Sequence, residues 1–145
     1  MEPNYLKNWR TVRAYVKARY NITQSELDTL FFLYSEKYFT RGGFEGFQKT
    51  LSWTAKVFDN LRTKGYIVIF CASDHVRKPT IYQLSPKAEK LIRHIYKVLE
   101  GKPISENGQV NPLFRNDTSS LEKAYRDMII KMNKATALQR HHPSE

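Results

Sequence analysis

Apolar residues recur along the first part of the chain with the period of an α-helix. Between residues 5 and 20 they stand three or four positions apart, with lysine and arginine on the other faces: Tyr5, Trp9, Val12, Val16 and Tyr20. This spacing predicts an amphipathic helix over residues 5–20. Thr23 and Glu26 then form the signature of a capping box, and the ring-rich apolar pattern behind them predicts a second helix to about Lys37.

Three glycines interrupt the helical pattern in the next segment. Gly42, Gly43 and Gly46 each lower helix propensity by about 1 kcal/mol relative to alanine. We therefore expect only a short helix over residues 44–49, with Phe44 and Phe47 packed inward.

A further helix is predicted to end at Lys64. Thr50 or Ser52 supplies an oxygen that caps its first turn, and Gly65 tolerates the left-handed conformation that stops it.

Two β-branched and aromatic runs follow, over residues 66–71 and 80–84, with polar residues 73–78 between them. This pattern is typical of two strands joined in a hairpin. Cys71 falls in the apolar first strand, so we expect its thiol to be buried and inert.

Ser85 caps a helix that continues to Gly101. Residues 102–117 carry proline, glycine and asparagine without periodicity, and predict an irregular connection. Ser119 then opens a last helix to about Leu138.

The net charge of the chain indicates what kind of partner it could bind. Its 145 residues hold 24 Lys and Arg against 14 Asp and Glu, a net charge of +10. Residues 1–20 carry +4 (five basic, one acidic) and residues 41–80 carry another +4 (seven basic, three acidic). Such an excess favours binding to a polyanion with a steep salt dependence. An ordinary solvated basic surface has the same composition.

The composition also excludes several classes of protein. The single cysteine excludes an internal disulfide and a cysteine-based zinc site, and suits a reducing compartment. No apolar run approaches the roughly 20 residues that span a bilayer, and the first residues lack the apolar segment of a signal peptide. We expect a soluble protein of the cytoplasm or nucleoid, without a membrane partner.

Helix, turn, helix and a hairpin with a basic tip form a winged helix-turn-helix. The stretch TAKVFDNLRTKGYI at residues 54–67 resembles the recognition helix and following strand of the MarR family of transcription regulators. The run LSPKA at residues 84–88 resembles that family's entry to the helix after the wing. The resemblance covers residues 23–99. It implies a mainly α fold with a small β-hairpin (α+β), in which N- and C-terminal dimerisation helices flank the winged helix-turn-helix.

The resemblance also suggests a domain organisation. Residues 1–100 form the DNA-binding domain with its N-terminal helix, residues 101–118 an irregular connection, and residues 119–145 a C-terminal helix and tail that serve dimerisation.

Base contacts are expected from the helix around residues 52–64. Lys56 stands where the family usually has an arginine near the DNA groove, whereas Ala55 stands where it often has serine or threonine. Base contacts then rest on Ser52, Trp53, Lys56 and Asn60. For Trp53 the alternative is packing on neighbouring side chains, and for Asn60 it is a solvated helix face.

The wing tip resembles the acidic and basic tip of the family, where cations meet phosphate; an exposed charged turn is the alternative. Lys64 adds to the expected positive footprint of the helix. The candidate DNA-binding residues are Lys49, Ser52, Trp53, Lys56, Asn60, Arg62, His75, Arg77 and Lys78.

Motifs for catalysis do not emerge from the sequence. We find no phosphate-binding glycine loop, no nucleophile-elbow serine and no histidine spacing typical of metal ligands. We expect no enzyme activity, no cofactor and no metal, with His94 on a helix flank.

Two functions remain open. The first is a homodimeric regulator that binds double-stranded DNA. A small-molecule effector has no assigned site, because core packing explains the rings of Tyr20, Phe31 and Tyr34 equally well. The second is a winged-helix interaction or structural module in replication, packaging or viral assembly, with little or no sequence-specific DNA binding. Ala55 and the three glycines motivate this alternative.

Overall fold

The structure is a computed structural model, and it describes residues 4–51, 54–116 and 118–141. The fold is mainly helical with one small hairpin, as the sequence predicts. Two compact units make up the chain. One comprises the described residues of 1–22 and 94–145, and the other those of 23–93.

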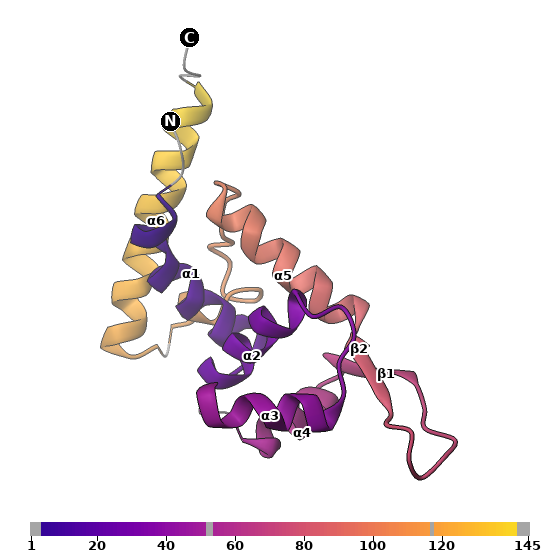
Figure 1. Cartoon of the computed structure of the whole chain (residues 1–145). Coiled ribbons are helices and arrows are strands. Elements are labelled where there is room, and N and C mark those ends of the chain that lie inside the picture. Colours follow the sequence, from indigo (N-terminus) through magenta and orange to yellow (C-terminus); the bar gives the residue numbers. More distant parts are fainter. Residues whose placement is uncertain (1–3, 52–53, 117, 142–145) are drawn as a thin grey trace. The chain divides into compact units, whose positions relative to one another are not determined.

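The hairpin and its neighbouring helices carry the expected winged-helix order (Figure 1). In chain order the elements are α1 (Tyr5–Tyr20), α2 (Gln24–Tyr34), α3 (Arg41–Leu51), α4 (Ala55–Thr63), β1 (Ile67–Cys71), β2 (Ile81–Leu84), α5 (Pro86–Leu99), the 3₁₀ helix η1 (Pro112–Phe114) and α6 (Ser120–His141).

The capping box at the start of α2 is confirmed. The Thr23 hydroxyl accepts from the Glu26 amide at 3.2 Å, and the Glu26 carboxylate accepts from the Thr23 amide at 3.0 Å. The helix ends at Tyr34, three residues before the predicted end, and the Ser35 hydroxyl donates to the carbonyl of Phe32 at 2.9 Å.

The expectation of a short helix around the glycines is wrong, because α3 runs continuously from Arg41 to Leu51. The Thr40 hydroxyl accepts from the Gly43 amide at 2.9 Å and caps the first turn. Phe44 is 1% exposed and packs on Phe58, with ring centroids 5.2 Å apart. The expectation that Phe47 packs inward is wrong, because its ring is 37% exposed and lies against Phe32, with ring centroids 4.8 Å apart. We infer that this burial offsets the propensity cost of the glycines.

The start of α4 also differs from the prediction. The helix begins at Ala55, and Thr54 occupies the N-cap position in an extended conformation without a side-chain capping bond. Thr50 lies within α3, and Ser52 lies outside the described residues. The expected cap at Thr50 is therefore wrong, and the expected cap at Ser52 falls on a residue outside the described ones.

The hairpin pairs β1 with β2 in antiparallel register, from Ile67 opposite Leu84 to Cys71 opposite Ile81, with an irregularity between Ile69 and Cys71. An isolated bridge joins Phe39 to Tyr82 of β2. The loop between the strands projects from the helices of this unit (Figure 1). The expectation of a buried Cys71 is wrong. Only the start of β1 packs into the core, and Cys71 lies at its exposed end.

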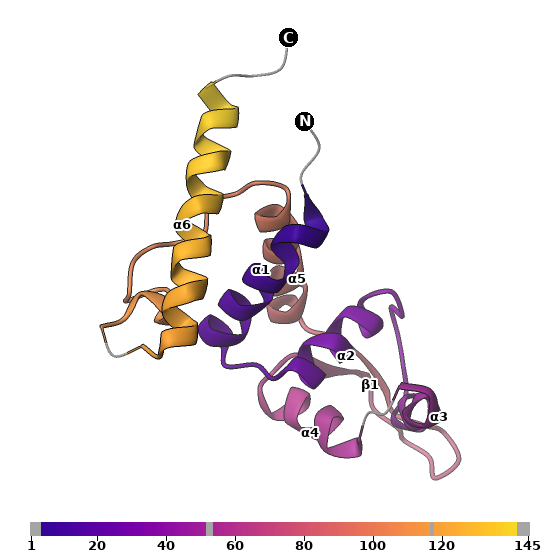
Figure 2. The same ribbon diagram turned by 90° about the vertical axis from the view of Figure 1, so that its left-hand side faces the viewer.

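The other unit contains α1, η1 and α6, in which α1 and α6 run in opposite directions (Figure 2). Residues 101–116 are mostly irregular, but side-chain hydrogen bonds order them. Asn133 of α6 donates to the carbonyl of Ile104 at 2.8 Å and accepts from its amide at 3.0 Å. Arg126 donates to the carbonyl of Leu113 at 2.8 Å. These bonds hold the connection on α6.

Candidate nucleic-acid interface

One face of α4 is buried and the other carries polar side chains. Phe58 and Leu61 are fully buried. Lys56 and Thr63 are exposed and Asn60 is half-buried between them. Their spacing of four and three residues places these three side chains on one stripe of the helix. In the part of the chain that the structure describes, the side chains of Lys56 and Asn60 have no polar partner.

The orientation of α4 on α3 is set by an ion pair. Arg41 of α3 donates two hydrogen bonds to the carboxylate of Asp59, at 2.5 and 3.1 Å, and it lies 3.4 Å from Glu45. The bonds from Arg41 lower the pKa of Asp59. Arg41 and Asp59 therefore neutralise each other at the surface of the unit, and Arg41 adds little to a positive footprint.

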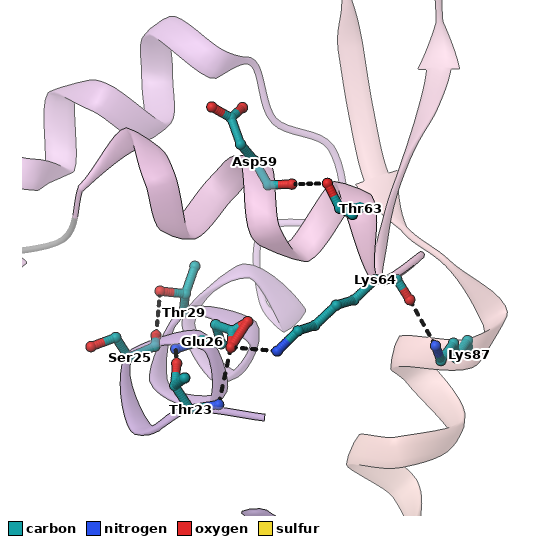
Figure 3. A network of polar contacts seen from close by, with 8 residues as sticks. All are labelled: Thr23, Ser25, Glu26, Thr29, Asp59, Thr63, Lys64 and Lys87. Atoms are coloured by element: carbon teal, nitrogen blue, oxygen red, sulfur yellow. Dashed lines mark hydrogen bonds and ion pairs between the residues drawn. The ribbon is translucent and has the colours of Figure 1, made fainter. Parts of the chain in front are cut away.

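A second ion pair holds the end of α4 against α2 (Figure 3). The Lys64 ammonium lies 2.8 Å from Oε1 of Glu26, whose side chain is only 2% exposed. Burial alone would raise the pKa of Glu26, but the hydrogen bonds from Lys64 and Thr23 outweigh it and lower this pKa. Lys64, which the sequence suggested as part of the DNA footprint, is thus used within the fold.

The same residue fixes the turn from α4 into the hairpin. The Lys64 carbonyl accepts from the Lys87 ammonium at 2.7 Å (Figure 3). Gly65 follows with φ of +81°, a conformation that favours glycine. Its carbonyl accepts from the Ser85 hydroxyl at 2.6 Å, and the Lys87 ammonium lies 4.6 Å from the ring centre of Tyr66. The hydrogen bonds to the carbonyls of Lys64 and Gly65 therefore fix the angle between α4 and the strands.

Arg62 links α4 to the wing. It is exposed, and its guanidinium lies 5.0 Å from the ring centre of Tyr82 on β2. Tyr82 in turn packs edge-on against Phe58 of α4, with centroids 5.1 Å apart. A cation therefore sits at the junction of α4 and the hairpin.

The loop of the wing is ordered by its own polar groups. The Ser73 hydroxyl lies within hydrogen-bond distance of the carbonyl oxygens of His75 and Lys78. Nδ1 of His75 accepts from the Arg77 amide at 3.1 Å. Asp74 lies 4.0 Å from the exposed Lys78 ammonium. Within the described residues the Arg77 side chain has no ionic partner.

Six of the nine candidate residues can be placed in one unit. Lys56, Asn60 and Arg62 belong to α4, and His75, Arg77 and Lys78 to the wing loop. Lys49 lies in α3, but its side chain is not among those described. Ser52 and Trp53 lie outside the described residues.

The supporting residues Arg41, Glu26 and Tyr82 were not predicted from the sequence. The capping box gave a local reason for Glu26, but its partner Lys64 stands 38 positions later. Arg41 and Asp59 are 18 positions apart. The sequence shows that these side chains are charged, but it does not show which acidic residue pairs with which basic residue.

His94, in the other unit, sits half-buried on α5. Its Nε2 lies 3.1 Å from the hydroxyl of Tyr15, which accepts from Arg19. Burial, and after it the charges of Arg19, Lys102 and Lys97, lower the pKa of His94 to about 4. The ring is therefore neutral at pH 7.

Among the described side chains, no three His, Cys, Asp or Glu residues gather as a metal site. Over the same residues, no helix combines the length and apolarity needed to cross a bilayer.

A solved structure with a similar arrangement is the crystal structure of a mutant MarR from E. coli complexed with operator DNA. The match covers 87% of this chain and 84% of that chain, with 14% sequence identity and a TM-score of 0.47. No protein-family model and no curated protein matches the chain.

Proposed function

We propose that the protein is a transcription regulator that binds double-stranded DNA as a homodimer, in the cytoplasm or nucleoid. The observation that carries the proposal is the cation arrangement around α4. Lys56 has no described partner, and Arg62 sits at the junction of α4 with the wing. Other cations of the unit, Arg41 and Lys64, are paired with carboxylates. Lys56, Arg62 and Arg77 thus leave positive charge on the elements that enter DNA in a winged helix, while Lys90 and Arg93 are exposed on α5.

The stripe of α4 supplies the base contacts in this proposal. A lysine ammonium donates to the O6 and N7 acceptors of guanine, and an asparagine amide pairs with N6 and N7 of adenine. Lys56 and Asn60 stand four residues apart on one stripe, which suits neighbouring base pairs in the major groove. Arg62, Arg77 and Lys78 contact phosphates.

Homodimerisation is supported by exposed apolar side chains on α1 and α6, in the unit that these two helices form with η1. Leu6 of α1 is 92% exposed, and Leu121 and Leu138 of α6 are 65% and 62% exposed. A second copy that covers these side chains removes them from water and duplicates α4 for a two-fold symmetric DNA site. Sedimentation should give the mass of a dimer, and Leu138→Glu should shift it toward the monomer.

Selection of bound sequences from random duplex DNA tests this function. The expected result is an enriched palindrome whose half-sites are about one helical turn apart. Enrichment of no sequence, with retained binding at low salt, contradicts base recognition by α4. Absence of binding at low salt contradicts the proposal altogether.

The wing favours a second candidate, a protein-interaction module. Phe70 of β1 is 52% exposed and stacks at 4.4 Å on the half-exposed ring of Tyr38, while Val76 in the loop is fully exposed. Exposed apolar side chains on a hairpin suit a protein partner. Phe70→Ser should then abolish partner capture in a pull-down, whereas a DNA regulator with this substitution keeps its DNA affinity.

A further inference from the structure

The first helix, α1, carries charge of one sign only. Its 16 residues include five lysines and arginines but no aspartate or glutamate. The helix belongs to the unit of η1 and α6, and none of the candidate DNA-binding residues lies on it. An unbalanced charge of this kind on one element favours an anionic partner.

Three of these cations form what we call the basic face of α1. Arg10, Arg13 and Lys17 are three and four residues apart, a spacing that places their side chains on one side of the helix. Arg10 is exposed, and Arg13 and Lys17 are half-buried, as expected for side chains whose stems lie on the protein while the charged ends reach water. Among the described residues, no carboxylate lies within ion-pair distance of these three groups.

Arg19, near the end of the same helix, is used within the fold instead. It donates to the Tyr15 hydroxyl, and its guanidinium lies 5.8 Å and 5.1 Å from the ring centres of Tyr15 and Tyr20. Leu6, one turn before Arg10, belongs to the proposed homodimer contact. The charge that α1 offers to another partner is therefore that of its basic face.

The packing of α1 favours a nucleic acid over a membrane as this partner. Val12, Tyr15 and Val16 are at most 1% exposed, and α1 packs against α6 and η1. A helix that binds a lipid surface inserts its apolar face between the headgroups, and this face of α1 is already covered. For the same reason only the outer side of α1 can meet DNA, which suits contact with phosphates rather than with base edges.

The length of the basic face matches a phosphate backbone. Arg10 and Lys17 are seven positions apart, which corresponds to about 10 Å along a helix that rises 1.5 Å per residue. One strand of B-DNA carries a charge about every 3.4 Å along its axis, so about three phosphates fall within this length. The three cations thus meet a similar number of phosphates.

We propose that the basic face of α1 is a second DNA-binding surface, which contacts the phosphate backbone of duplex DNA without reading its bases. It adds affinity and salt dependence that are the same for every sequence. The inference rests on DNA as the partner in the proposed function, but not on α4 or the wing, because the basic face shares no residue with them.

Fluorescence anisotropy of the full chain with a labelled duplex of random sequence tests this surface. The Arg10→Gln, Arg13→Gln, Lys17→Gln triple variant removes the charges but keeps part of each stem. We expect the slope of log affinity against log salt to become shallower by about 2.7 per chain, from three phosphate contacts of about 0.9 each. Arg10→Gln alone, at the exposed position, should change the slope by about 0.9, which keeps the test decisive if circular dichroism shows that the triple variant is unfolded.

The matched control removes the same charge from exposed lysines of α6 in the same unit. The Lys123→Gln, Lys131→Gln, Lys134→Gln triple variant should keep the slope of the unsubstituted chain. Equal changes in the two triple variants overturn the proposal. Binding to phosphatidylglycerol vesicles that the α1 variant loses, with an unchanged slope on DNA, also overturns it and assigns the basic face to a membrane.

The Lys56→Ala, Arg77→Ala double variant separates this surface from α4 and the wing. Adding the three α1 substitutions to it should lower the slope on random duplex by a further 2.7 or so per chain, about 0.9 for each contact. No further change overturns the proposal and leaves the role of α4 and the wing intact. A double variant that binds like the unsubstituted chain, together with a loss in the α1 variant, contradicts α4 and the wing and supports the basic face.

Discussion

Replacing Lys64 by methionine separates a structural lysine from a DNA-binding one. The substitution keeps the length of the side chain but removes the ammonium group that lies 2.8 Å from Glu26. By position in the sequence Lys64 belongs with the cations that face DNA. Its contacts assign it instead to the stability of the α2–α4 pair.

The size of the effect follows from the burial of the two partners. Removing one partner of a buried ion pair costs about 3–5 kcal/mol. Here Glu26 is 2% exposed but Lys64 is 31% exposed, so water already reaches one side of the pair. The Thr23 amide also continues to bond the carboxylate at 3.0 Å. We therefore expect Lys64→Met to lower the free energy of unfolding by about 2–3 kcal/mol at pH 7.

The pH dependence gives the effect a characteristic sign. In the unsubstituted protein the pKa of Glu26 is below its usual 4.5, so its stabilisation is present above pH 4.5 and lost as the pH falls further. Without Lys64 the burial of Glu26 raises this pKa instead. The variant then loses stability as the pH rises from 4.5. The difference between the two proteins should be largest at pH 7 and shrink as the pH falls below 4.5.

Urea denaturation followed by circular dichroism at several pH values measures this difference. Glu26→Gln combined with Lys64→Met removes the uncompensated charge and should recover most of the loss. Lys56→Met is the matched control on α4, where an exposed lysine without a partner should change stability by less than about 0.5 kcal/mol. A Lys64→Met variant as stable as this control, with an equal loss of DNA affinity, would refute the structural role.

The remaining predictions concern the backbone, a histidine and an asparagine. Gly46 lies inside α3 with open space where an added methyl group would lie, so Gly46→Ala should stabilise the protein by up to about 1 kcal/mol in urea denaturation. Gly65→Ala, at a φ of +81°, should destabilise it, and the opposite order would contradict the backbone assignment. Because the pKa of His94 is lowered from 6.5 to about 4, stability should fall as the pH decreases between these values. The partly exposed ring limits this loss to about 1–2 kcal/mol, and His94→Gln should abolish it. Asn133→Ala removes both bonds to Ile104 and should cost about 2 kcal/mol; an unchanged melting temperature would show that these bonds do not hold the connection.

Local signals predicted much of the fold. The capping box of Thr23 and Glu26 and the cap at Ser85, whose hydroxyl accepts from the Ala88 amide at 3.2 Å, depend on residues three positions apart. Such contacts are visible in a sequence because the backbone geometry of a helix start fixes the spacing.

Long-range packing explains the failures. The glycines of α3 predict a weak helix, yet Phe44 meets Phe58 across the unit and keeps the helix continuous. Asn133 meets Ile104 over 29 positions, so an apparently irregular segment has ordered partners. Neither contact follows from local propensity.

In the candidate interface, too, local signals were visible in the sequence and long-range contacts were not. The sequence indicated which side chains are charged, but not that Lys64 and Arg41 are paired within the fold. Only the structure separates these residues from Lys56 and Arg77, for which the described residues offer no ionic partner.

The salt dependence of binding to duplex DNA tests the central claim most directly. Fluorescence anisotropy of a labelled duplex gives the slope of log affinity against log salt, which changes by about 0.9 for each phosphate contact. We predict that the Lys56→Ala, Arg77→Ala double variant binds more weakly, with a slope shallower by about 0.9 per chain because the phosphate contact of Arg77 is lost. The Lys90→Ala, Arg93→Ala double variant removes the same charge from exposed positions of α5 and should keep the original slope. Equal changes in the two double variants would contradict an interface formed by α4 and the wing.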